Sequence, residues 1–277
     1  MDKSKYYPKI SIVTITYNSE KTVEETIQSV VSQNYPNLEY LIIDGGSKDS
    51  TLDIVERYRN KISFVLSEPD KGISDAFNKG VKNATGEIIG IINSDDILLP
   101  SALQAIADEY ESNVDVYRGN TIIWNLELNT NVSVPPGMRC SVDDKWGGGV
   151  NHPSTFITKR AYDKVGLYNT EYRYAMDVDI LYRLYNEGLN FKRIDKDLAK
   201  FRLGGETSTL WTKKVKERYL IRRRKGASKL LAIKSNVIFA IRPSLMSIVT
   251  ICFPKDILYK IKYRGNKNDK KSKFLKI

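Results

Sequence analysis

Carboxylate side chains follow three of the apolar segments in the first hundred residues. Asp44, Asp70 and the adjacent pair Asp95-Asp96 each come shortly after such a segment ends. Two neighbouring carboxylates repel each other unless a cation is present, and their oxygen atoms suit Mg²⁺ or Mn²⁺. The pair therefore predicts a Mn²⁺ or Mg²⁺ site that could bridge a diphosphate. The alternative is a turn and a helix cap, both common roles for Asp, with Pro100 a few residues further on.

The segments that would position these carboxylates alternate between strand and helix patterns. β-branched and apolar runs predict strands at 10–17, 40–43, 62–66 and 88–92. Helical spacing of apolar residues separates them, and Asn18 or Ser19 is predicted to cap the first helix. Strands that alternate with helices of about ten residues predict βαβ units around a parallel sheet. Ligands of such sheets bind beyond the carboxyl ends of the strands, so the carboxylates gather at one rim.

The second half of the chain predicts shorter and more varied elements. Its helices are expected around 101–110 and 178–187. Its strands are expected at 114–117, 121–124, 154–157, 190–194 and 198–202. The predicted fold class is therefore α/β, a mostly parallel sheet flanked by helices.

Two common phosphate-binding sequences are absent. The chain has neither GxGxxG after its first strand nor GxxxxGK[ST], so phosphates must be held in another way, and a metal ion would do so. Asp44, before Gly45-Gly46, is either a turn residue or an acceptor for the imide N–H of a pyrimidine base at the strand ends.

Four segments together resemble the family 2 glycosyltransferases. They run in order over residues 8–100, and the likeness continues more loosely to about residue 209. The segments are SIVTITYN at 11–18, IDGGSKDST at 43–51, SEPDKGISDAFNKG at 67–80 and ATGEIIGIINSDD at 84–96. The resemblance implies the A-type glycosyltransferase fold, a nucleotide-sugar donor and inversion at the anomeric carbon.

The resemblance also implies roles for residues in the first half. Asp44 would bind the base, and Ser94-Asp95-Asp96 stands where the family has its DxD-like metal motif. Because the first position of this motif is Ser rather than Asp, Asp96 would be the main metal ligand, and Asp95 would lie nearer the ribose or donor sugar. Thr16, Tyr17 and Asn18 would line the nucleotide pocket, and Asp70 and Lys71 would lie near the ribose and phosphates.

In the second half the resemblance implies a general base. Asp177 matches the base position, although Met176 replaces the Glu of the family motif, and Asp179 is the fallback. The simpler interpretation is two carboxylates at a helix N-terminus, where the helix dipole favours them. His152, preceded by a Trp-Gly-Gly-Gly segment at 146–149, is either structural or a contact to the diphosphate, metal or donor sugar. A Gly-Gly segment at 203–208 resembles a loop that closes over the donor.

Charge divides the chain into two parts. Residues 210–277 hold 20 of the 44 Lys and Arg but 3 of the 33 Asp and Glu, a balance of +17, which leaves −6 for residues 1–209. We therefore predict a catalytic domain at 1–209, with a nucleotide-binding half (1–100) and an acceptor half (101–209), that stays folded without the basic segment 210–277. Nucleic-acid binding would rest on the basic segment alone, so no nucleic-acid partner is expected.

The basic segment predicts association with an anionic membrane surface. Its apolar pieces, 237–241 and 245–253, are each shorter than the roughly 20 residues of a membrane-spanning helix. Interfacial helices are the better interpretation. Eight basic residues lie between 213 and 225: Lys213, Lys214, Lys216, Arg218, Arg222, Arg223, Arg224 and Lys225.

The residue counts exclude other classes of protein. A single histidine and two cysteines, Cys140 and Cys252, exclude a disulfide framework and zinc sites built on several His or Cys. The first ten residues contain no apolar run, so no secretory signal is predicted. We expect a cytoplasmic enzyme, peripheral on the inner membrane face, that transfers sugar from a UDP-sugar to a lipid-linked saccharide. The alternative is a sugar-nucleotide nucleotidyltransferase, which should have a Gly-rich, Arg-containing loop after the first strand, where this chain has Thr-Tyr-Asn-Ser.

Overall fold

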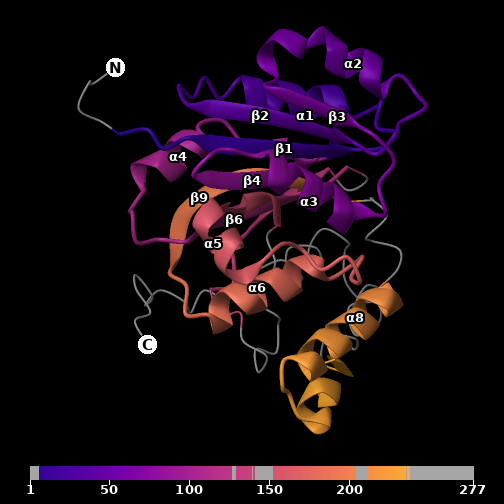
Figure 1. Ribbon diagram of the computed structural model, residues 1–277, viewed down its shortest axis with the longest axis vertical. Coiled ribbons are helices and arrows are strands. Elements are labelled where there is room, and N and C mark those ends of the chain that lie inside the picture. Colours follow the sequence, from indigo (N-terminus) through magenta and orange to yellow (C-terminus); the bar gives the residue numbers. More distant parts are fainter. Residues whose placement is uncertain are drawn as a thin grey trace.

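The structure of the chain, a computed structural model, describes residues 6–126, 129–138, 140, 152–203, 211–234 and 236–237. In these residues a nine-stranded sheet has the order β3-β2-β1-β4-β8-β6-β9-β5, with β7 beside β6. Helices cover both of its faces (Figure 1). The segments expected at 146–149, at 204–208 and beyond residue 237 lie outside the described residues.

The first four strands are parallel, as predicted. The register pairs Thr16 with Asp44, Asp44 with Ser67, and Ile15 with Asn93, so the carboxyl ends of the strands lie level with one another. The rim predicted from the sequence is therefore present. The strands are β1 (Ile10–Thr16), β2 (Leu38–Asp44), β3 (Phe64–Ser67) and β4 (Ile88–Asn93).

Alternate residues of these strands face two separate apolar cores. Ile10 and Ile12 pack into the core beneath one set of helices, whereas Val13 packs into the core on the opposite face. The first core is covered by α1 (Val23–Val31), α2 (Thr51–Arg57) and α4 (Ala102–Asp108), and a 3₁₀ turn, η1 (Arg59–Lys61), follows α2. The second is covered by α3 (Ile73–Asn83), α5 (Lys159–Val165) and α6 (Met176–Asn186).

The cap predicted for α1 is wrong. The helix begins after Thr22, and no side chain caps it. Asn18 is in the left-handed conformation, with φ 47°, and its side-chain oxygen accepts the N–H of Lys48. The Ser19 hydroxyl lies 2.7 Å from that of Ser94. Both side chains are engaged with the rim, so neither reaches the helix.

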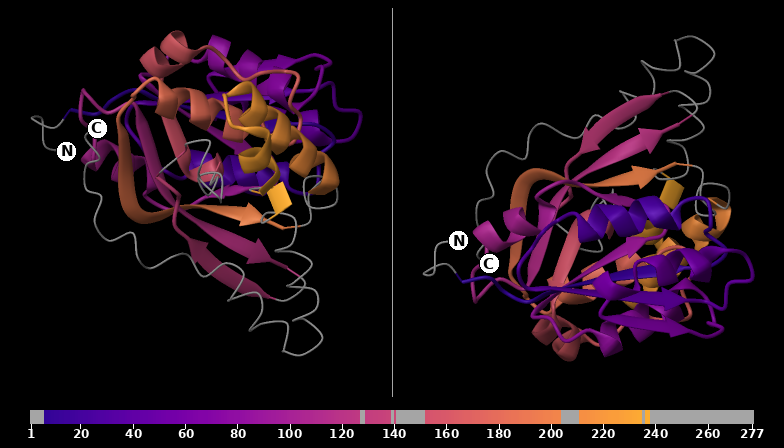
Figure 2. Two further views of the ribbon diagram at one scale, coloured as in Figure 1. Left: turned by 90° about the horizontal axis from the view of Figure 1, so that it is seen from below. Right: turned by 90° about the horizontal axis from the view of Figure 1, so that it is seen from above.

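Beyond β4 the sheet mixes parallel and antiparallel pairs. The short strand β8 runs antiparallel to both β4 and β6, and β9 runs parallel to β6. Figure 2 shows β9 bending along its length and the β6–β7 hairpin extending away from the helices. The elements are β5 (Ile97–Leu98), β6 (Val116–Asn125), β7 (Thr130–Val134), the 3₁₀ turn η2 (His152–Ser154), β8 (Thr155–Thr158) and β9 (Phe191–Arg202).

In the second half of the chain, two pairs of predicted strands each form one continuous strand. The strands expected at 114–117 and 121–124 form one strand, β6, and those expected at 190–194 and 198–202 form one strand, β9. The β6–β9 pairing shifts register around Asn120, and a Cβ at Gly119 would lie 2.4 Å from the Leu198 side chain. An irregular pairing with close backbone approach therefore interrupts the sequence pattern without ending either strand.

The basic helix α8 (Trp211–Arg224) packs beside the N-terminal end of α6 (Figure 1). Ile221 is fully buried in the core that α6 covers. The basic helix therefore contributes to the same core as α3, α5 and α6. No helix within the described residues is long and apolar enough to span a bilayer.

Candidate active site

Two side-chain oxygen atoms at the ends of adjacent strands lack hydrogen-bond partners among the described residues. Thr16 ends β1 and Asn93 ends β4, and within the described part of the chain no group hydrogen-bonds to Thr16 Oγ1 or Asn93 Oδ1. Buried polar atoms are nearly always paired with protein or water, so unpaired ones at a rim are candidates for contact with a ligand. They mark the part of the rim at which β1 and β4 meet.

Asp44 is fully buried and organises the turn after β2. Its Oδ2 accepts the N–H groups of Gly46 and Ser47 at 3.0 Å each and the Ser67 hydroxyl at 2.7 Å. The Ser47 hydroxyl donates to Oδ1. The carboxylate therefore fixes the shape of the loop at this rim, and its predicted contact with a base stays a prediction.

The residues predicted to surround a nucleotide gather beside this turn. Tyr17 is exposed, and Asp70 accepts the N–H of Gly72 at 2.8 Å. A Cβ at Gly45 would lie 2.5 Å from Asp70 Oδ2 and 3.4 Å from the Tyr17 ring. Both side chains thus converge on Gly45, where the absence of a side chain leaves them room. Lys71 is exposed next to them.

The two carboxylates of the predicted metal motif have different surroundings. Asp96 is fully buried, and its oxygens accept the Arg202 N–H at 3.2 Å and the Asn93 amide at 3.3 Å. Asp95 is half-buried, and its backbone carbonyl accepts Arg202 Nε at 3.1 Å. Burial raises the pKa of both carboxyls, and Asp95 raises that of Asp96 further.

This carboxylate pair fits a divalent cation. A cation would offset the repulsion that raises the Asp96 pKa, and both groups supply the oxygen atoms that Mg²⁺ and Mn²⁺ prefer. No three His, Cys, Asp or Glu side chains come together among the residues described, so the remaining ligands would be water or phosphate oxygens. Because Asp96 is enclosed and Asp95 is not, Asp95 is better placed to reach the cation than the sequence argument supposed.

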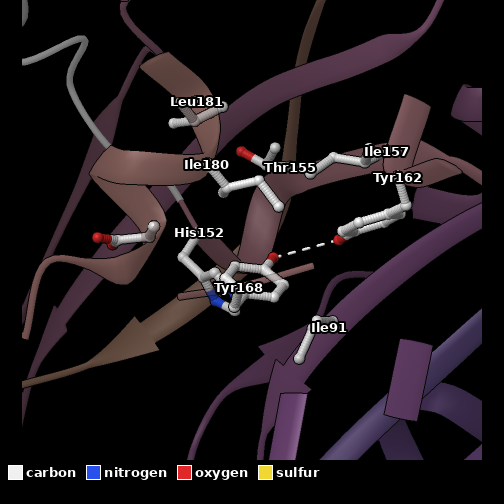
Figure 3. Close-up of a pocket in the computed structure, with 9 residues that line it drawn as sticks. Ile91, His152, Thr155, Ile157, Tyr162, Tyr168, Ile180 and Leu181 are labelled. Atoms are coloured by element: carbon white, nitrogen blue, oxygen red, sulfur yellow. Dashed lines mark hydrogen bonds between the residues drawn. The ribbon is translucent and has the colours of Figure 1, made fainter. Parts of the chain in front are cut away.

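A second group of side chains lies across β4 from this motif. His152, from η2, and Asp177, from α6, line one small cavity of about 10 Å³ together with Ile91 of β4. Figure 3 shows the lining, including the hydrogen bond between the Tyr162 and Tyr168 hydroxyls. His152 and the predicted base therefore lie against β4, the strand that leads into Asp95-Asp96.

The surroundings of Asp177 and Asp179 distinguish the two. Asp177 is half-buried in the cavity wall, and its Oδ1 accepts the N–H of Val178 at 2.8 Å. Asp179 is buried, and its Oδ2 lies 2.9 Å from Arg183 Nε. Since Arg183 also donates to the carbonyls of 165–167, Asp179 belongs to a structural network, which favours Asp177 as the residue free to act on a ligand.

Several groups near Asp177 have perturbed ionisation. Burial lowers the pKa of His152, and the Asp177 charge acts in the opposite direction. The His152 ring stacks on Phe77 with the ring centres 4.8 Å apart. Arg118, fully buried on β6, hydrogen-bonds to Thr155 at 3.3 Å. Burial lowers the pKa of Arg118, whereas Cys140 and Asp177 act to raise it. The sequence analysis missed Arg118, although a charged residue within an apolar strand is a usable signal.

Comparison with known proteins gives consistent findings. The profile of the family described as "Glycosyl transferase family 2" matches residues 11–167. Chondroitin synthase of Escherichia coli is 29% identical over 74% of this chain, which spans only 30% of the synthase.

Two solved structures are similar in fold. That of Staphylococcus aureus TarS 1–349 in complex with UDP-GlcNAc has a TM-score of 0.60 and 21% identity, over 82% of this chain and 70% of that one. The mannosyltransferase PcManGT from Pyrobaculum calidifontis, in complex with GDP-Man and Mn²⁺, has a TM-score of 0.64 and 15% identity, over 94% of this chain and 85% of that one. At these identities the likeness shows the fold, which is the A-type glycosyltransferase fold that the sequence predicts.

Proposed function

The chain belongs to glycosyl transferase family 2, and we propose that it transfers a hexosyl or N-acetylhexosaminyl group, with inversion, from a UDP-sugar to a hydroxyl of a lipid-linked glycan. The observation that carries the proposal is the contact of both groups of residues with β4. The donor motifs end β1 to β4, and His152 and Asp177 meet Ile91 of β4 beside them. One donor molecule could therefore contact both groups.

The proposed roles follow from exposure at this rim. Tyr17 and Asp70 hold the base and ribose beside the turn that Asp44 organises, with Thr16, Asn18 and Lys71 near them. Asp95 holds the cation, and Asp96 supports that loop through Arg202. A bound Mn²⁺ or Mg²⁺ would neutralise charge on the departing diphosphate.

Transfer would then be a single displacement. Asp177 accepts the proton of the acceptor hydroxyl while the acceptor oxygen bonds to the anomeric carbon. The bond from that carbon to the diphosphate oxygen breaks, and its electron pair leaves with the UDP. Cavity residues His152 and Tyr168, both beside Phe77, would shield the proton transfer from water.

Uridine is proposed as the base because TarS, which has a similar fold, was solved with UDP and with UDP-GlcNAc. The GDP-Man complex of PcManGT supplies the competing choice. The test compares thermal stabilisation by UDP and GDP with Mn²⁺, and nucleotide release from UDP-glucose, UDP-galactose, their N-acetylamino forms and GDP-mannose. Stronger stabilisation by GDP, with release only from GDP-mannose, would reject the uridine assignment.

The acceptor part of the proposal rests on the surface around α8. Lys213, Lys216 and Arg223 are exposed there, and the helical residues 229–234 that follow expose Leu230 and Ile233. Cationic and apolar side chains on one surface suit the interface of an anionic membrane. We propose that this surface holds the enzyme on the inner face of the cell membrane, near lipid-linked acceptors of surface-polysaccharide synthesis.

A further inference from the structure

A carboxylate on α8 holds the backbone directly before α6. Glu217 Oε1 accepts the N–H of Arg173 at 3.0 Å, and its Oε2 accepts the N–H groups of Tyr174 at 2.7 Å and Ala175 at 2.9 Å. Ala175 is the N-cap of α6, and Asp177 is the second residue of the helix. Three consecutive backbone donors next to the proposed base thus share one side-chain acceptor.

Two further hydrogen bonds, one from α3 and one from α8, hold Tyr172 in the same segment. The Ser74 hydroxyl of α3 donates to the carbonyl of Tyr172 at 2.6 Å, and Arg224 of α8 donates to the Tyr172 hydroxyl at 3.0 Å. Ala175 is completely buried. The backbone at 172–175 is therefore fixed between α3 and α8. Because α6 begins directly after this segment, the position of its first turn is fixed as well.

We propose that Glu217 is a positioning residue that fixes Asp177 in its reactive place. The proposal rests on Asp177 being the base of the proposed function. A helix begins with N–H groups that lack partners within the helix, and an anion near that end is favoured by the helix dipole. A carboxylate can accept several such bonds, whereas a Gln in its place offers one acceptor oxygen and a competing N–H₂ donor.

The first measurement is independent of catalysis. In Glu217→Gln we expect faster amide hydrogen exchange across 173–178, with the exchange of β1 to β4 unchanged. The matched control is Glu171→Gln, which removes an exposed carboxylate whose α8 partner is Arg224, and which should leave exchange at 173–178 unaltered. Unchanged exchange in Glu217→Gln overturns the proposal.

The second measurement separates positioning from stability. A displacement of about 1 Å in a reacting group can cost ~10²-fold, so we expect Glu217→Gln to lower the rate of UDP release by ~10- to 100-fold, with UDP affinity within about twofold of wild type. Loss of UDP binding together with activity indicates general unfolding and overturns the proposal.

The double variant tests whether Glu217 acts through Asp177. Adding Glu217→Gln to Asp177→Asn should slow UDP release no further than Asp177→Asn alone, since the base is already gone. Fully multiplicative effects overturn the proposal. If Asp177→Asn itself is as active as wild type, the assignment of the base has failed, whatever the exchange measurement gives.

Discussion

Asp177 and Asp179 stand two residues apart on α6, yet one faces a cavity and the other a guanidinium. We expect Asp177→Asn to lose at least ~10²-fold in turnover, the low end for removal of a general base, with UDP affinity little changed. Asp179→Asn should instead lower the melting temperature, because a charged hydrogen bond of roughly 1.5–3 kcal/mol is weakened. Steady-state UDP release and thermal unfolding of both variants provide the comparison.

The opposite pattern would move the base by two residues. If Asp179→Asn loses turnover at unchanged stability and Asp177→Asn does not, Asp179 is the base and its pairing with Arg183 breaks during catalysis.

The metal assignment makes a separate prediction about Asp95 and Asp96. Mn²⁺ should strengthen UDP binding to wild type, and Asp95→Asn should remove most of this gain, because Asp95 is the carboxylate that reaches the rim. Titration calorimetry of UDP with Mn²⁺ and in EDTA measures it. Asp96→Asn should retain part of the gain but unfold at a lower temperature, since its single amide oxygen cannot accept from both the Arg202 N–H and the Asn93 amide. If the gain survives in Asp95→Asn and vanishes in Asp96→Asn, the original assignment to Asp96 stands.

For single residues, the sequence predicts which strand end a side chain occupies better than it predicts the direction in which that side chain points. Strand-end carboxylates are visible because apolar runs stop at them, so the rim with Asp44 and Asp95-Asp96 could be predicted. Which of two adjacent carboxylates points inward could not, because the Arg202 N–H that Asp96 accepts comes from a residue 106 positions later in the chain. Arg118 was missed for the same reason, since its partners are also distant in sequence.

Among the elements, α8 differs most from its sequence-based interpretation. Its many basic residues suggested a solvated or membrane-facing helix, but Arg218 and Arg222 are buried and Lys225 lies 3.8 Å from Asp179. A basic run hides such packing because, among the side chains of α8 that the structure describes, Ile221 is the one buried apolar residue. The strands β6 and β9 were divided wrongly for a related reason, as the irregular pairing around Asn120 depends on the partner strand.

The packing of α8 predicts unequal effects of two adjacent substitutions. Ile221→Ala should destabilise the protein by about 2–5 kcal/mol, as for other buried apolar truncations, because Ile221 is wholly enclosed. Leu220→Ala, at a position with 36% of its surface exposed, should cost about 1 kcal/mol or less. Chemical denaturation of the two variants measures the difference.

Equal effects would mean that α8 is not packed on the catalytic half. A chain ended near residue 209 would lose Ile221 and the Glu217 contacts together. We therefore expect it to melt at a lower temperature and release UDP slowly, and the packing argues against the independent folding that the charge division suggested.

At the scale of the whole molecule, the packing of α8 limits which basic side chains are available to contact a membrane. Arg218 and Arg222 are buried, and Arg224 and Lys225 face Glu171 and Asp179. Of the eight basic residues counted between 213 and 225, two are therefore buried and two form ion pairs with carboxylates. The proposed membrane surface must rely on the exposed cations of α8 and the helical residues after it.

These exposed cations carry the last prediction. A basic side chain near an anionic surface contributes about 1 kcal/mol, so changing four of them to Gln should weaken binding to phosphatidylserine vesicles by ~10²-fold or more. The four are Lys213, Lys216, Arg223 and Lys229. A control with four exposed cations changed elsewhere, Lys21, Arg59, Lys61 and Lys82, should bind almost as wild type.

Salt separates the two contributions to this binding. Rising salt should weaken vesicle binding of the wild type without abolishing it, because exposed charges are screened while burial of Leu230 and Ile233, which are 78% and 42% exposed, is not. Leu230→Ser with Ile233→Ser should remove most of the salt-resistant part, and UDP affinity should stay unchanged because these residues lie outside the rim. Vesicle co-sedimentation over a salt series measures both. If the fourfold Gln variant and its control bind equally well, the surface around α8 is not the anchor, and the acceptor need not be membrane-bound.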